Sequence, residues 1–349
     1  MIRPIQYLRA LAAMMVVWHH ALGQIDSYSN FIVLPEFGPS GVDLFFVISG
    51  FIMIVTTTAK PLTPWQFFEL RIVRVVPLYW LVTLLMIGCA VVAPSAFKTL
   101  LFSPAAVAKS LFFVPYYSLS FPNEVWPVLV PGWTLNYEMF FYAIFALTLA
   151  LPLGIRMIWL VAILCALVTT GRLIQPTNPI AFVYTSPLML EFGLGAIIGY
   201  LWTRKGLEAG LTISLAAMAV GVVMLFNRSD LWGYSPMVGA TLTVIGCLHA
   251  RIRAWDSRFL LAMGDASYSI YLTHLFTLGA MRVVWVRLLP HASASTAVAF
   301  MITALALCAA VGWICYRWVE EPLTRHLRRL VKRKPAGAVL PESIRVRPS

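Results

Sequence analysis

The sequence predicts an all-α, polytopic membrane protein with about ten transmembrane helices and both termini in the cytoplasm. Three observations lead to this fold class. Hydrophobic residues make up 60% of the 349 positions and charged residues only 11%, whereas a soluble domain carries roughly a quarter charged residues. Apolar runs of about 20 residues, the length of a helix that crosses a bilayer, recur along the chain. Basic residues gather in alternate loops, as the positive-inside rule requires.

Ten apolar segments are predicted as membrane spans. They cover roughly residues 5–24, 40–58, 73–93, 132–151, 155–171, 182–202, 209–226, 232–249, 265–289 and 293–317. An even number of spans places both termini on one side of the membrane. If that side is the cytoplasm, the inner loops and the C-terminal tail hold most of the basic residues that lie outside the spans.

One connection, residues 94–131, is long and contains six prolines and many aromatic residues. Under the predicted topology it lies outside, either along the membrane surface or folded over a cavity. We expect one membrane domain over residues 1–330. Residues 331–349 are expected to form a basic, disordered cytoplasmic tail.

The formal net charge of +12 would suit a nucleic-acid partner if the basic residues formed a groove. They lie instead in short loops and in the tail, so we expect a lipid bilayer and no nucleic acid. The sequence shows no metal-ligand spacing, no Gly-rich phosphate loop and no Ser-His-Asp elbow. This argues against a metalloenzyme, a P-loop enzyme and a hydrolase, and no metal ligands are predicted.

The first predicted span contains two ionisable residues, Arg9 and His20. They are eleven positions apart, so they share one helix face and are separated by about 16 Å along the axis. Ionisable groups within a span are costly and mark functional sites by default. His19 points about 80° away from Arg9 on the same helix. The alternative is an arginine that snorkels to the interface and a histidine bonded to a neighbouring helix.

Two carboxylates lie near the predicted outer ends of spans, Asp43 in the second and Glu138 in the fourth. Asp43 is expected at the depth of His20, where a carboxylate can orient a histidine and raise its basicity. The alternative for Asp43 is a helix-start aspartate favoured by the helix dipole. Glu138 is expected about two turns inside the outer face, with Tyr142 one turn below it.

Two further groups are expected toward the cytoplasm. Arg71 and Arg74, in the loop after the second span, are spaced to clamp phosphate oxygens, although an ordinary positive-inside flank has the same composition. Ser267, Tyr271 and His274 form an i, i+4, i+7 stripe that suits a polar cavity or hydrogen bonds between helices. Together with His20, Asp43 and Glu138 toward the outside, they suggest that a group passes through the middle of the protein.

Six motifs, spread in order from the first predicted span to the last, resemble those of the membrane-bound acyltransferase-3 family. They are Arg-x10-His (Arg9 to His20), GVDLFFVISGF at 41–51, RxxR at 71–74, GWTLNYEMFFY at 132–142, SYSIYLTH at 267–274 and YRWVEEP at 316–322. The resemblance covers about residues 1–330. The opening IQYLRALAAMMVVWHHA is most similar to exopolysaccharide O-acetyltransferases of Gram-negative bacteria.

The resemblance implies an enzyme of the bacterial inner membrane that moves an acetyl group to a sugar hydroxyl of an exported polysaccharide or its lipid-linked repeat unit. It implies acetyl-CoA from the cytoplasm as co-substrate and no tightly bound cofactor. The expected catalytic residue is His20, with Glu138 and Asp43 as its partners. The expected acetyl-CoA-binding residues are Arg9, Arg71, Arg74, Ser267, Tyr271 and His274.

This sequence departs from the family pattern at two positions. Thr134 stands where the family more often has serine, which keeps the hydroxyl, and His19 stands beside His20 and competes with it for the assignment. We also expect no fused periplasmic esterase-like domain. The transfer would then be completed within the membrane domain.

The main alternative function is a proton-coupled transporter or a flippase of polysaccharide precursors, since both place ionisable residues within spans. A non-enzymatic scaffold fits the polar motifs poorly. A nearer alternative keeps the chemistry and exchanges the acetyl group for succinyl, or the acceptor for peptidoglycan, O-antigen or a small glycoside.

Overall fold

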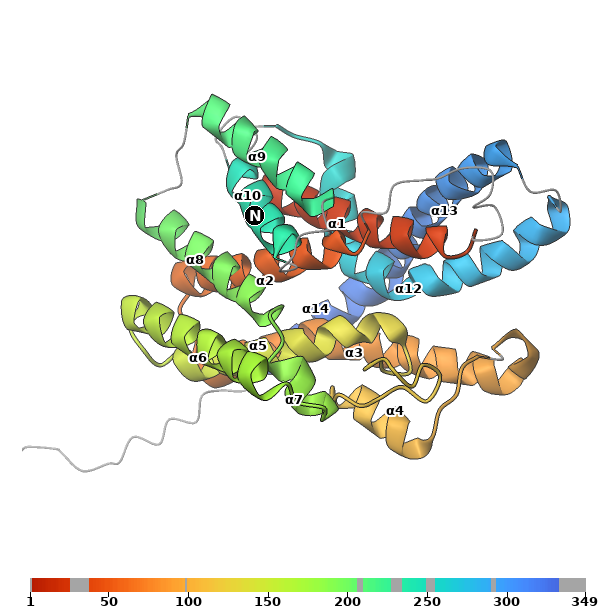
Figure 1. Cartoon of the computed structure of the whole chain (residues 1–349), viewed down its shortest axis with the longest axis horizontal. Helices are drawn as coiled ribbons and strands as arrows, with labels where there is room; N and C mark the ends of the chain where they lie inside the picture. The colour runs from red at the N-terminus through yellow and green to blue at the C-terminus, as the bar shows by residue number, and fades with distance from the viewer. Residues whose placement is uncertain are drawn as a thin grey trace, which may run out of the picture.

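The computed structural model is a bundle of helices, most of which run roughly along its longest axis (Figure 1). It describes residues 2–25, 38–97, 99–205, 210–226, 234–248, 255–289 and 293–332. In these residues all regular secondary structure is helical. The α-helices are α1 (Arg3–Leu22), α2 (Ser40–Ala59), α3 (Pro64–Val92), α4 (Pro104–Leu111), α5 (Trp133–Thr148), α6 (Leu153–Ile174), α7 (Pro179–Tyr184), α8 (Met189–Lys205), α9 (Leu211–Phe226), α10 (Ser235–Cys247), α12 (Arg258–Leu288), α13 (Ala294–Cys315) and α14 (Glu321–Lys332).

Three shorter turns complete the described secondary structure. Two are 3-10 turns, η2 (Pro94–Ala96) and η3 (Val130–Gly132). The third, η4 (Tyr316–Glu320), is a π-helical turn that joins α13 to α14 without a break.

Every one of the ten predicted spans is helical along most of its length. Six helical stretches of the described chain are long and apolar enough to cross a membrane, and α9 and α10 are shorter apolar helices. A helix satisfies its own backbone hydrogen bonds, which lipid cannot do. The chain is therefore a multi-pass helical membrane protein. The count of ten spans stays a prediction.

Two helices begin more than one turn before their predicted starts. The span predicted at 73–93 belongs to α3, which starts at Pro64 behind a capping box formed by Thr63 and Gln66. Arg71 and Arg74, predicted in a loop, thus lie on a helix. The span predicted at 265–289 belongs to α12, which starts at Arg258 after the cap Ser257. Capping hydrogen bonds extend both helices into polar sequence that hydropathy alone assigns to loops.

The span predicted at 182–202 is not continuous. Asn178 caps the short helix α7, which ends at Tyr184, and α8 begins only at Met189. Pro187 lies between the two helices. Proline disfavours the helical conformation of the residue before it, and this accounts for the break.

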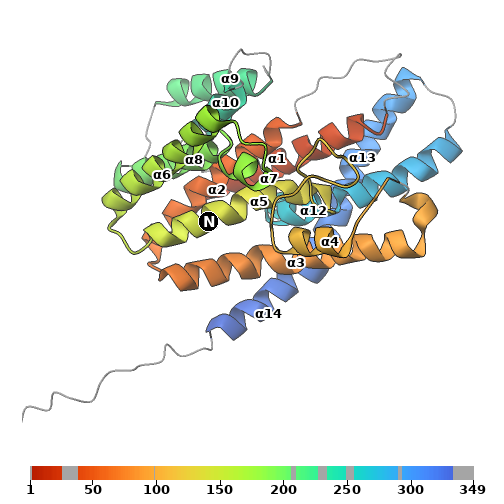
Figure 2. The same cartoon turned by 60° about the horizontal axis from the view of Figure 1, so that its bottom comes forward.

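Helices α2 and α8 cross closely because glycine faces backbone at their contact. A Cβ added to Gly50 would lie 2.0 Å from the carbonyl oxygen of Phe192, and one added to Gly195 would lie 1.9 Å from that of Val47. Small residues at such crossings are typical of helix packing in membranes. On the other side of α2, α1 packs between α2 and α12. Helices α9 and α10 form a pair at one edge of the bundle (Figures 1 and 2).

The long connection predicted between two spans folds against α3 and α7. Tyr79 and Trp80 of α3 donate hydrogen bonds to the backbone oxygens of Ser110 and Leu111, at 3.2 and 2.8 Å. Tyr184 of α7 donates to the carbonyl of Phe113 at 3.2 Å. The connection ends in η3, which leads directly into α5.

The C-terminal helix α14 lies against α3, away from most of the bundle (Figure 2). It ends at Lys332, and the rest of the tail predicted over residues 331–349 lies outside the described residues.

Candidate functional site

A cavity of about 350 Å³ lies where α1, α2, α3, α5 and α12 meet. Ligand pockets in proteins run from roughly 300 to 1,000 Å³, so this volume is that of a small ligand or of part of a larger one. Six of the nine predicted site residues line it: Arg9, Arg71, Arg74, Glu138, Ser267 and Tyr271. These residues come from four helices that are far apart in the sequence.

The cavity is positively charged. Among the described residues that line it, three arginines stand against the single carboxylate of Glu138, and Glu320, which pairs with Arg74 from outside the lining, leaves a formal balance of 3 − 2 = +1. Charges in a bundle interior act through a low effective dielectric, so this excess strongly favours an anionic ligand.

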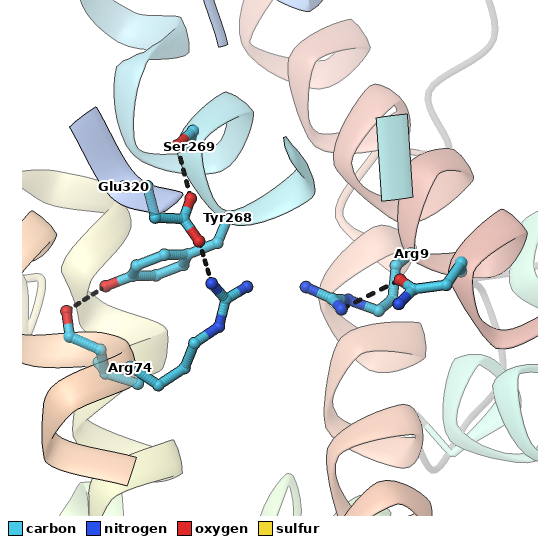
Figure 3. Close-up of polar contacts among 7 residues, drawn as sticks. Arg9, Arg74, Tyr268, Ser269 and Glu320 are labelled. Atoms are coloured by element: carbon cyan, nitrogen blue, oxygen red, sulfur yellow. Dashed lines mark hydrogen bonds and ion pairs between the residues drawn. The ribbon is translucent and has the colours of Figure 1, made fainter. Parts of the chain in front are cut away.

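Arg9 and Arg74 point toward one another from α1 and α3 (Figure 3). Arg9 donates a 3.1 Å hydrogen bond to the side-chain oxygen of Gln6, one turn earlier on the same helix. Arg74 forms an ion pair with Glu320 of η4, and its guanidinium lies 5.7 Å from the ring centre of Tyr268. The far oxygen of Glu320 accepts a 2.6 Å hydrogen bond from Ser269.

Arg71 lies against aromatic rings on the same side of the cavity. Its guanidinium carbon is 5.5 Å from the ring centre of Phe67 and 5.9 Å from that of Tyr142, both within the range of cation–π attraction. Its Nε is buried and has no hydrogen-bond partner among the described residues, and the same holds for the hydroxyl of Ser267. Unsatisfied buried groups are costly, so a ligand that bonds them is bound more tightly.

Glu138 is held at the cavity wall by two hydroxyls. Tyr142, one turn further along α5 as predicted, donates to its carboxylate, and Ser49 of α2 donates at 3.3 Å. This places Glu138 in the arginine cavity rather than beside His20. The sequence groups Glu138 with His20, whereas the structure groups it with the arginines, because the stagger of α5 against its neighbours does not follow from one sequence; its depth in the membrane stays a prediction.

Tyr271 lines the cavity on the side of α12. Its hydroxyl bonds to Thr134 at 2.9 Å and donates to the carbonyl of Pro131 at 2.9 Å. Its ring lies 5.9 Å from Phe45 and 6.0 Å from His274, measured between ring centres. Thr134, which stands where the family more often has serine, uses its hydroxyl to fix this tyrosine.

His20 and His274 form a pair beyond Tyr271. Their ring centres are 4.8 Å apart, and His20 also contacts His19 at 5.0 Å. Nδ1 of His20 lies 2.9 Å from the carbonyl of Val16, and Nδ1 of His274 lies 2.6 Å from that of Tyr271. A carbonyl only accepts hydrogen bonds, so each Nδ1 carries the proton and each neutral ring keeps a lone pair on Nε2.

The described contacts of His20 do not include a carboxylate. Asp43 is buried near the start of α2, and the partners of His20 are Val16, His19 and His274. The sequence predicts that Asp43 or Glu138 orients His20, but neither is among these contacts. The ring of His274 lies against His20 instead. The sequence groups His274 with the arginines because it shares a helix face with Ser267 and Tyr271. That spacing does not show how far along α1 this face of α12 reaches.

Four residues of this site were not singled out from the sequence: Gln6, Ser49, Tyr268 and Glu320. Ser49 and Tyr268 lie within the motifs of the second and ninth predicted spans, and Glu320 lies within the closing motif at 316–322. Gln6 is three residues before Arg9, the spacing at which two side chains on a helix meet. These signals mark candidates, and only the packing of α1, α3 and α12 shows which of them contact an arginine.

Comparisons with known proteins agree with one another. The family model described as "Acyltransferase domain" matches residues 3–317. The chain is 39% identical over 308 residues to "Exopolysaccharide production protein ExoZ" of Rhizobium meliloti (strain 1021), covering 86% of this chain and 93% of that protein. It is 28% identical to "Putative membrane-bound transacylase BcsY" of Komagataeibacter xylinus, covering 78% of this chain and 72% of that protein. No solved structure matches the chain.

Proposed function

The chain belongs to the acyltransferase-3 family, and we propose that it transfers an acetyl group from acetyl-CoA to a sugar hydroxyl of an exported polysaccharide. The acceptor is an exopolysaccharide or its lipid-linked repeat unit, as the name of the Rhizobium relative suggests. The enzyme works in the bacterial inner membrane with ten spans and both termini in the cytoplasm. Its family membership favours this function over a proton-coupled transporter or a flippase.

One observation carries the choice of donor: Arg9, Arg71 and Arg74 line a single cavity. Guanidinium groups bind phosphate oxygens through paired N–H bonds, and CoA carries several phosphate oxygens. We assign the phosphates of acetyl-CoA to these arginines and the adjoining chain of the donor to the Ser267 and Tyr271 side. The thioester must then extend past Tyr271 to meet His20.

His20 is the proposed general base. Its Nδ1 is held by Val16, so the lone pair on Nε2 is available to take the proton from the sugar hydroxyl. The hydroxyl oxygen attacks the thioester carbonyl, the C–S bond breaks, and the proton passes from His20 to the departing CoA thiolate. A route in which His20 itself carries the acetyl group obeys the same geometry.

The test uses purified protein in nanodiscs with acetyl-labelled acetyl-CoA and native cell-envelope glycans. We expect label in the glycans with wild type, and at least about 100-fold less with His20→Ala, since a general base contributes 10²- to 10⁴-fold. Arg71→Ala should raise KM for acetyl-CoA. His19→Ala is the matched control and should transfer normally.

Three outcomes would contradict this proposal. Full activity of His20→Ala would remove His20 from the mechanism, and loss in His19→Ala alone would move the role to its neighbour. If folded wild type neither binds nor turns over acetyl-CoA, the transporter becomes the favoured function.

A further inference from the structure

Glu320 and Glu321 are adjacent in the chain but have different surroundings. Glu320 ends the π-helical turn η4 and is only 1% exposed. Glu321 begins α14 and pairs with Arg317 and Arg325 on the helix surface. A π-helical turn contains one residue more than an α-helical turn, and this extra residue rotates the following side chains by about 100° around the helix axis. Such turns are frequent at functional sites. Of the two carboxylates, η4 thus directs Glu320 into the bundle.

Both carboxylate oxygens of Glu320 are engaged. One forms the ion pair with Arg74, and the other accepts the hydrogen bond from Ser269. The ring of Tyr268 packs against the same guanidinium, and its hydroxyl is fixed by a 2.7 Å hydrogen bond to the carbonyl of Val75. Arg74 is therefore held from two sides, by α12 and by η4 (Figure 3).

Arg74 requires this restraint because it faces another cation. Figure 3 shows the guanidinium groups of Arg9 and Arg74 pointing toward one another, and both line the cavity. Like charges repel strongly in a low-dielectric interior. Long basic side chains near a membrane otherwise turn toward water. Glu320 keeps the guanidinium of Arg74 at the cavity while its opposite side stays directed at Arg9.

We propose that Glu320 is a positioning residue of the donor site: held by Ser269, it fixes Arg74 opposite Arg9 so that both guanidiniums bind one phosphate group of the donor. This inference rests on the proposed function, since it takes the donor to be a CoA thioester. A cation pair fixed in advance binds phosphate without the entropy cost of ordering two long side chains.

Direct binding separates this role from catalysis. CoA affinity is measured by calorimetry on full-length wild type, Glu320→Gln and Glu321→Gln in nanodiscs. We expect Glu320→Gln to weaken CoA binding by about tenfold. Glu321→Gln removes the neighbouring carboxylate from exposed ion pairs and should bind CoA as wild type does.

A phosphate-free donor provides the second readout. With S-acetylpantetheine, Glu320→Gln and wild type should have the same kcat/KM, whereas with acetyl-CoA the variant should show a raised KM and little change in kcat. An equal loss with both donors would show that Glu320 supports the fold in general, and would overturn the proposal.

A double-mutant cycle tests whether Glu320 acts through Arg74. Glu320→Gln should cost no further CoA affinity in the Arg74→Gln background, and an equal cost in both backgrounds would overturn the proposal. If Glu320→Gln does not fold, Ser269→Ala removes only the supporting hydroxyl. It should also weaken CoA binding, and unchanged affinity there would count against the proposal.

The inference and the proposed function fail in distinguishable ways. CoA binding with the expected cycle but without acetyl transfer would contradict only the proposed function. No CoA binding by wild type would overturn both.

Discussion

At the scale of single residues, the proposed general base His20 has a second histidine, His274, as its neighbour instead of a carboxylate. Backbone carbonyls select the tautomers of His20 and His274, so that in the neutral form both rings keep Nε2 unprotonated. His274 is fully buried, and its Nε2 has no hydrogen-bond partner in the described part of the chain. A second imidazole, its ring centre 4.8 Å away, would under the proposed function be the polar neighbour of His20 when it takes up a proton during transfer.

This arrangement predicts that His274 serves His20 rather than the donor. His274→Asn keeps an amide N–H near the carbonyl of Tyr271 and removes Nε2. We expect kcat to fall by about tenfold or more, within the range of lost acid–base assistance, and KM for acetyl-CoA to stay unchanged. Steady-state kinetics over a range of acetyl-CoA concentrations measures both values. A raised KM with unchanged kcat would instead support the donor-binding role that the sequence suggested.

The residues of the site were largely predictable from the sequence, but their grouping was not. Arg9, Arg71 and Arg74 stand out because charge is costly within or beside apolar helices, and the structure brings all three to one cavity. Glu138, predicted beside His20, lies with the arginines, and His274, predicted with the arginines, lies against His20. Depth along a helix follows from spacing, whereas the stagger between helices depends on packing that one sequence does not display.

At the scale of elements, the contact of α2 with α8 depends on the absence of a side chain at Gly195. Gly195→Val would force α8 away from Val47, because even a Cβ would lie 1.9 Å from its carbonyl oxygen. Overpacking of this kind costs about 1–3 kcal/mol or more. We expect a lower melting temperature and less monodisperse protein in detergent, measured by fluorescence-detected size exclusion with a thermal ramp.

The matched control is Gly88→Ala in α3, where an added Cβ has no neighbour within 4 Å. Alanine is favoured over glycine in a helix by about 0.5–1 kcal/mol, so this variant should be as stable as wild type or slightly more stable. Equal destabilisation by both substitutions would mean that the α2–α8 contact is not the cause.

The helices themselves follow from apolar length, and all ten predicted segments are helical along most of their length. Their ends depend on local chemistry that hydropathy ignores. The capping box at Thr63 extends α3, and Pro187 separates α7 from α8. The π-helical turn η4 was not predicted, because a single inserted residue leaves no trace in an apolar pattern.

At the scale of the whole molecule, the orientation in the membrane decides which compartment supplies the donor. Arg71 lies seven residues after the start of α3 at Pro64, which is about 10 Å at 1.5 Å per residue. The arginine cavity is therefore nearer to the α2–α3 connection than to the connection that follows α3. Since acetyl-CoA is made in the cytoplasm, the α2–α3 connection must face that side if the proposed function holds.

Cysteine labelling tests this orientation directly. The five native cysteines are first replaced. Lys60→Cys then marks the α2–α3 connection, and Lys109→Cys marks the connection after α3. The two positions lie on opposite sides of α3, which is long and apolar enough to cross a membrane. In intact cells a membrane-impermeant maleimide should label the Lys109→Cys variant and spare the Lys60→Cys variant. After lysis both variants should react. The reverse pattern would place the arginines nearer the outer face, where no CoA thioester is available, and would exclude a cytoplasmic donor whatever the cavity binds in detergent.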